Sequence, residues 1–125
     1  MYLVKTPAIV KPLAKDLIWK IETSEKIIYL TFDDGPTPGV TETVLSILDD
    51  FDAKATFFCL GKNAEAHPEL FARLADSGHS VGSHSYSHQD GWKTGNYTYV
   101  KDALKGNQHI HSSIYRPPYL SLIHI

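Results

Sequence analysis

The sequence predicts an α/β fold in which helices flank a parallel sheet. Short apolar and β-branched segments alternate with segments of helical periodicity, in the order β-α-β-α-β-α-β. Polar side chains follow the ends of three of the predicted strands, which is where ligand sites gather in parallel sheets. The chain has 125 residues, enough for one modest domain with a real core.

Each element follows from a local pattern. Residues 26–32 read KIIYLTF, typical of a strand buried on both faces, and Gly35, Pro36 and Pro38 then predict a tight loop. Apolar residues from Val40 to Phe51 recur at helical spacing.

The remaining elements are less regular. We expect a buried strand at residues 54–60, a helix at 63–76, a short strand at 79–84, a weaker helix at 96–112 and the start of a fourth strand at 113–116.

Composition excludes several classes of protein. The formal charge of −2 gives no basic footprint, so neither nucleic acid nor an anionic membrane is an expected partner. No apolar run approaches the ~20 residues that span a bilayer. Residues 1–25 show no clear signal peptide, so the sequence does not indicate the cellular compartment. We expect these residues to form an N-terminal extension that packs on the domain. The single cysteine, Cys59, lies in an apolar run and is expected to be an inert core thiol.

Two aspartates, Asp33 and Asp34, stand at the end of the first predicted strand. Asp-Gly pairs are ordinary turn residues, so the pair by itself is weak evidence of a site. In a functional interpretation one carboxylate holds a cation and the other accepts a proton, which requires metal ligands elsewhere in the chain.

The segment SHSYSH supplies such ligands as His84 and His88, four residues apart. Alone, this spacing is more often found in surface histidines. Two histidines and one carboxylate nevertheless form the three-ligand pattern of a catalytic zinc, with a position left for water.

The segment YRPPY, residues 115–119, is either a rigid turn or a catalytic element. In the second case its rigidity holds Arg116 within reach of an aspartate and presents the Tyr119 N–H to an oxyanion.

Taken in order, TFDDGPTP, HSYSH and RPPY resemble the polysaccharide deacetylases, carbohydrate esterase family 4. The resemblance implies that Asp33 is the general base, oriented by Arg116. It also implies that Asp34, His84 and His88 bind a divalent metal, expected to be zinc, and that the Tyr119 N–H binds the oxyanion. A distorted (β/α)7-type barrel and a metal-dependent hydrolase that removes N-acetyl groups from an amino-sugar polymer, peptidoglycan- or chitin-like, are implied as well.

The sequence departs from the family pattern after Tyr119. Family members continue with further strands and a late Leu-His motif that supplies the general acid. We therefore expect residues 26–119 to be an incomplete catalytic domain, a partial barrel truncated after about the fourth strand, and residues 120–125 to be a non-native tail. Loss of a general acid commonly lowers the rate by about 10²–10⁴-fold, so low activity is expected of this chain.

Two alternatives remain open. The chain could be a non-catalytic carbohydrate-binding remnant, although the presence of Asp33 argues against this. It could also be a metal-dependent amidase acting on a non-sugar amide, because the same chemistry serves any exposed amide.

Overall fold

The computed structural model describes residues 23–120 and contains a three-stranded parallel sheet. Its strands are β1 (Leu30–Gly35), β2 (Ala55–Cys59) and β3 (Ser80–Ser83), hydrogen-bonded in the order β1-β2-β3. Each connection is helical, as parallel neighbours require. The predicted α/β class is confirmed.

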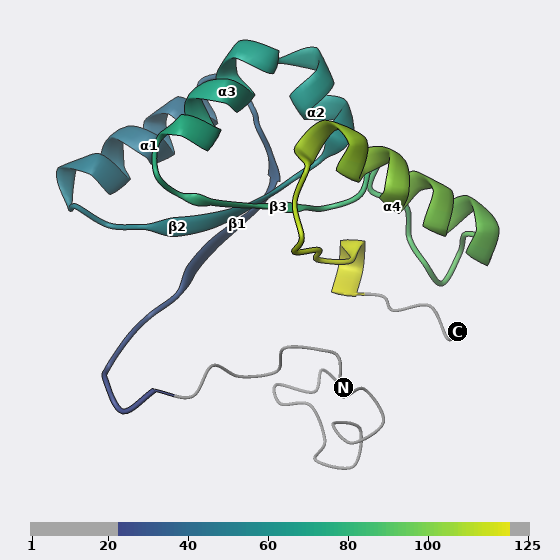
Figure 1. Cartoon of the computed structure of the whole chain (residues 1–125), viewed down its shortest axis with the longest axis horizontal. Coiled ribbons are helices and arrows are strands. Elements are labelled where there is room, and N and C mark those ends of the chain that lie inside the picture. Colours follow the sequence, from purple (N-terminus) through teal and green to yellow (C-terminus); the bar gives the residue numbers. More distant parts are fainter. Residues whose placement is uncertain (1–22, 121–125) are drawn as a thin grey trace.

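Four α-helices accompany this sheet among residues 23–120. They are α1 (Val40–Asp50), α2 (Gly61–Ala66), α3 (Pro68–Asp76) and α4 (Asn96–Ile110), and a short 3₁₀ turn, η2, covers Pro118–Leu120. Figure 1 shows α1, α2 and α3 together on one side of the strands, with α4 near the end of β3. In the same figure the segment that leads into η2 passes below the end of β3, where Tyr115 pairs with Ser83.

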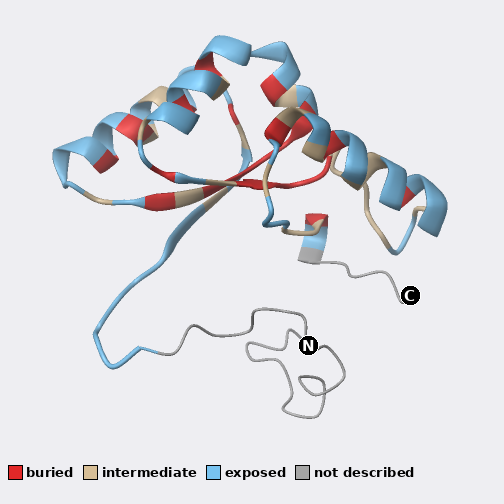
Figure 2. Ribbon diagram, viewed as in Figure 1, coloured by how far each residue is buried: buried red, intermediate tan, exposed pale blue. Residues whose placement is uncertain are grey.

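The core lies between the sheet and these helices. Figure 2 shows buried residues concentrated in β2, β3 and the inward stripes of the helices. One cluster joins Leu45 and Leu48 of α1 to Phe57 of β2, Leu74 of α3 and Ile110 of α4. Cys59 is a fully buried member of this cluster, and burial raises the pKa of its thiol to about 12, as expected of an inert thiol.

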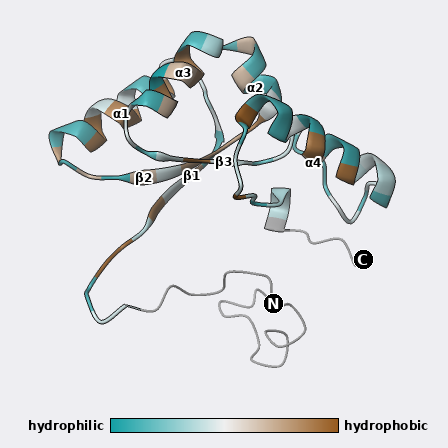
Figure 3. Ribbon diagram, in the orientation of Figure 1, coloured by the Kyte–Doolittle hydropathy of each residue, from teal (hydrophilic) through white to brown (hydrophobic). Residues whose placement is uncertain are grey.

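The first strand differs from its prediction. It covers Leu30–Gly35 instead of residues 26–32, and its side chains are mostly exposed. Ile28 is 84% exposed, and Figure 3 shows that the segment leading into β1 is apolar although it runs away from the body of the chain. The physical reason is that β1 pairs with β2 along one edge only, among residues 23–120. The sequence of this segment is therefore that of a buried strand, but among residues 23–120 no second strand pairs with the other edge of β1.

Two further boundaries also differ. The helix expected at residues 63–76 is two helices separated at His67, because Pro68 disfavours helical geometry in the residue before it and begins a new helix. The fourth strand is reduced to one parallel bridge between Ser83 and Tyr115.

Some predictions fall outside the described residues. Residues 1–22 of the expected N-terminal extension and residues 121–125 of the expected non-native tail belong to this part. Within residues 23–120, no helix is long and apolar enough to cross a membrane.

Candidate metal centre

A β-bulge at the end of β1 separates the two aspartates. Asp33 is opposite Phe58 and Gly35 is opposite Cys59, so Asp34 is the extra residue, and its φ of 69° is left-handed. Bulges re-aim a side chain out of the regular alternation of a strand. The pair was expected to lie beyond the strand; instead both residues belong to β1, and the bulge turns Asp34 toward the histidines.

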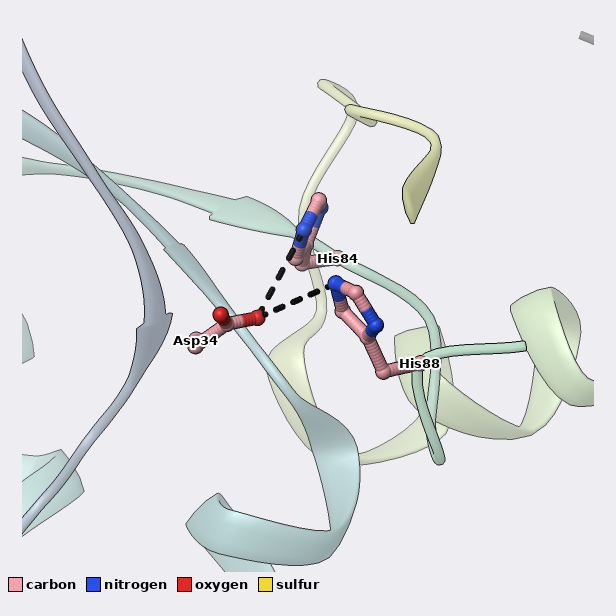
Figure 4. Close-up of side chains that lie close together, drawn as sticks. All are labelled: Asp34, His84 and His88. Carbon is pink, nitrogen blue, oxygen red and sulfur yellow. Dashed lines mark ion pairs between the residues drawn. The ribbon is translucent and has the colours of Figure 1, made fainter. Parts of the chain in front are cut away.

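The three expected metal ligands lie together at the carboxyl end of the sheet. Asp34 Oδ1 lies 3.7 Å from His84 Nε2 and 3.3 Å from His88 Nε2. One potential ligand atom from each residue lies within 4.8 Å of the other two. Figure 4 shows the carboxylate and both rings pointing toward one another.

The buried ring of His84 is oriented by the backbone. Its Nδ1 lies 2.6 Å from the Arg116 carbonyl oxygen, which can only accept, so Nδ1 donates this hydrogen bond and Nε2, which faces Asp34, is the ring nitrogen left to bind a metal. Metal-binding histidines typically have such a partner on the second ring nitrogen. Two imidazole nitrogens and one carboxylate oxygen therefore fit a divalent cation such as Zn²⁺.

Arg116 also contacts the other aspartate. Its Nη1 donates to Asp33 Oδ1 at 2.7 Å and to Thr31 Oγ1 at 3.0 Å. The guanidinium lies over the Phe58 ring, 4.0 Å from its centroid. The salt bridge and the aromatic contact fix the Arg116 side chain, which in turn fixes the orientation of Asp33.

Tyr119 lies next to the same cluster. Its ring centroid is 4.7 Å from that of His88, with the rings inclined at 66°. Its φ of 55° is left-handed. The predicted role of its N–H as an oxyanion donor stays a prediction.

Two titratable side chains near the cluster have shifted pKa values. The hydrogen bond from the Tyr86 hydroxyl lowers the pKa of Glu65, and His109 and Lys105 act in the same direction. Burial raises the pKa of Tyr115, whose hydroxyl donates to that of Tyr99. Tyr115 is therefore a neutral structural residue beside Arg116.

Three residues that support the cluster were not predicted from the sequence: Asn63, Ser85 and Asp102. Asn63 Nδ2 donates to the Asp34 carbonyl oxygen at 2.7 Å, the His88 N–H donates to Ser85 Oγ at 3.1 Å, and Asp102 binds the loop between the histidines. Asn63 comes shortly after the strand predicted at residues 54–60, and this position at a strand end could have indicated that it lies near the site. Asp102 lies in the same helical stripe as the buried residues Tyr99 and Gly106, and a carboxylate in such a stripe requires a partner.

Several known proteins are similar to this chain in sequence. A family model described as polysaccharide deacetylase matches residues 20–123. A peptidoglycan-N-acetylglucosamine deacetylase of Bacillus cereus is 33% identical over 105 residues, which cover 80% of this chain and 49% of that protein. A chitooligosaccharide deacetylase of Rhizobium leguminosarum bv. trifolii is 44% identical over 68 residues, covering 54% of this chain and 32% of that protein.

Solved structures show the same fold. The peptidoglycan deacetylase PdaC from Bacillus subtilis superposes with a TM-score of 0.73 at 31% identity, over 83% of this chain and 55% of that one. The chain thus spans about half the length of the B. cereus relative and of this structure. The prediction that it forms part of a (β/α) barrel is confirmed. On the match of the family model across most of its length, the chain belongs to the polysaccharide deacetylase family, carbohydrate esterase family 4.

Proposed function

We propose that the chain carries the metal-binding part of a hydrolase that removes N-acetyl groups from an amino-sugar glycan. The observation that carries this proposal is the Asp34–His84–His88 cluster, whose potential ligand atoms lie within 4.8 Å of one another. Beside it, Asp33 forms a salt bridge with Arg116. The relatives named as peptidoglycan and chitooligosaccharide deacetylases support a substrate of this class.

In this proposal the three clustered residues hold a divalent cation, with zinc favoured by the nitrogen-rich ligand set. When bound, such a cation supplies Lewis acidity, which lowers the pKa of water and polarises an acyl oxygen. The His84 ring is held by the Arg116 carbonyl at 2.6 Å, and this contact presets its ligand nitrogen.

Asp33 is the proposed general base. Arg116 holds its Oδ1 at 2.7 Å and leaves Oδ2 to accept a proton from the attacking water. Asp33 is 39% exposed on its side chain, so a substrate and a water molecule can reach it. The Tyr119 N–H is the proposed donor to the oxyanion that forms on the acetamide.

The test compares Asp33→Asn with His88→Ala in the full chain. Asp33→Asn is expected to keep zinc and lose acetate release from chitooligosaccharide, whereas His88→Ala loses both. Acetate release that is unchanged in Asp33→Asn would refute the assignment of the base. Binding of the glycan by the wild type with neither zinc uptake nor acetate release would favour a carbohydrate-binding remnant instead. Faster release from a non-sugar N-acetyl amide than from the glycan would favour an amidase.

A further inference from the structure

The loop between the two histidines is held from two sides. On one side, the backbone N–H groups of Gly61 and Lys62, at the start of α2, donate to the Ser85 and Tyr86 carbonyl oxygens at 2.9 and 3.2 Å. On the other side, a single carboxylate from α4, that of Asp102, accepts three hydrogen bonds. Together these contacts satisfy four backbone groups of the loop: the carbonyl oxygens of Ser85 and Tyr86 and the N–H groups of Tyr86 and Ser87.

The three bonds of Asp102 define one arrangement of the loop. Its Oδ2 accepts from the backbone N–H groups of Tyr86 and Ser87, both at 3.1 Å. Its Oδ1 accepts from the Ser87 hydroxyl at 2.6 Å. Hydrogen bonds to an ionised acceptor are about twice as strong as neutral ones, so this carboxylate fixes two successive peptide groups.

The loop needs this support because its backbone is strained at both flanks. Ser85 has a φ of 70° and His88 a φ of 60°, and both are non-glycine residues in the left-handed region. Each such residue persists only where surrounding contacts over-determine it. A loop released from Asp102 would relax toward ordinary φ values and would turn the His88 ring away from Asp34.

We propose that Asp102 is a positioning residue for the metal centre, acting through the loop backbone and touching neither metal nor substrate. The inference rests on the proposed function, because it assigns a consequence to the geometry of His84 and His88. It adds a residue that lies outside the three sequence motifs.

The experiment measures Zn²⁺ affinity by competition with a chromophoric chelator for wild type, Asp102→Ala, Asp102→Asn and the control Lys101→Ala. Loss of groups that orient metal ligands typically lowers metal affinity about 10–100-fold, which is the effect expected for Asp102→Ala. Asp102→Asn should restore most of the affinity, since its amide oxygen can still accept from both N–H groups. Lys101 is exposed on the same helix, and its variant should match wild type.

Two further readouts separate positioning from general stability. The visible absorption spectrum of the Co²⁺-loaded chain should change in Asp102→Ala and return in Asp102→Asn. In the metal-free chain, hydrogen exchange at the Tyr86 and Ser87 amides should be faster in Asp102→Ala but not in Lys101→Ala. If Asp102→Ala does not fold, Ser87→Ala, which removes only the bond to Oδ1, should still weaken zinc binding.

The outcomes distinguish the two proposals. If a folded Asp102→Ala variant binds zinc as tightly as wild type, the role of Asp102 is overturned and the proposed function stands. The same conclusion follows from unchanged zinc affinity in Ser87→Ala if Asp102→Ala does not fold. If wild type binds neither Zn²⁺ nor Co²⁺, the proposed function fails, and amide exchange alone then decides whether Asp102 holds the loop. Equal exchange in Asp102→Ala and Lys101→Ala would overturn the inference.

Discussion

Gly106 on α4 is the position where one methyl group should cause the largest disturbance near the site. A Cβ built there would lie 2.3 Å from the Ser85 carbonyl carbon, 2.4 Å from its oxygen and 2.7 Å from the Tyr86 nitrogen. Carbon atoms pack at about 3.5 Å, so Gly106→Ala requires α4 and the loop to separate by about 1.2 Å. Both sides of this contact are backbone, and neither can yield by a change of rotamer.

The expected change in the free energy of unfolding of Gly106→Ala combines a favourable effect on the helix with unfavourable effects on packing and hydrogen bonding. Alanine in a helix interior is favoured over glycine by about 1 kcal/mol. Overpacking costs about 1–3 kcal/mol, and the shift would also partly weaken the three hydrogen bonds to the Asp102 carboxylate, each worth about 1.5–3 kcal/mol when intact. We expect Gly106→Ala to lower the free energy of unfolding by about 2 kcal/mol, against helix propensity.

Urea denaturation followed by circular dichroism measures this difference, and Gly95→Ala is the matched control. Gly95 precedes the same helix with a φ of −60°, and an added Cβ would meet nothing within 4 Å. That variant should change stability by less than about 1 kcal/mol. If Gly106→Ala is as stable as wild type and binds zinc equally well, the close approach of α4 to the loop is wrong.

Three further predictions concern the site and the core. Arg116→Lys should lower acetate release by about 10²-fold through misplacement of the base, as measured by an acetate assay. Its zinc affinity should persist, because the backbone carbonyl, and not the side chain, binds His84; loss of zinc would contradict this division. Asn63→Ala should weaken zinc binding about 10-fold in a chelator titration, because it releases the Asp34 backbone, and unchanged binding would count against that contact. His79 is buried, neither ring nitrogen has a hydrogen-bond partner among residues 23–120, and burial lowers its pKa. The unfolded chain therefore takes up a proton below about pH 6.5 before the folded chain does, so stability should fall as pH drops through this range. His79→Leu should remove that step from denaturation curves recorded between pH 7 and 5, and a step that persists would assign it to another group.

The sequence predicted the grouping of the site better than its geometry. Carboxyl ends of parallel strands meet at one edge of a sheet, so motifs that follow the first and third strands had to approach one another. The distances of Asp34 from His84 and His88 agree with that expectation, while the roles of these residues stay predictions. The bulge at Asp34 was not predictable, because a register shift depends on pairing with β2 and leaves no mark on composition.

The misplaced boundary of β1 has a different cause. Residues 26–32 carry strand propensity, but propensity specifies a strand only where a neighbour supplies hydrogen bonds. The paired part begins at Leu30, opposite Ala55 of β2.

Sequence periodicity also places Asp102 correctly on α4, but the residues that it binds, Tyr86 and Ser87, are 16 and 15 positions earlier in the chain. Only the tertiary fold brings them together.

Backbone conformation links the fold to the chemistry at this site. Asp34, Ser85, His88 and Tyr119 all have φ between 55° and 70°, a region that disfavours residues with a side chain. Such residues cost of order 1–3 kcal/mol each and concentrate at functional sites. Here the contacts that offset the strain come mainly from two helices: Asn63 and the N–H groups at the start of α2, and Asp102 on α4. The sheet brings the three candidate ligands to one edge, but the helices hold the turns that point them at one another. Substitutions of Asn63 in α2 and of Asp102 in α4, whose side chains hold these turns through backbone groups, should therefore alter metal binding although neither residue is a candidate ligand.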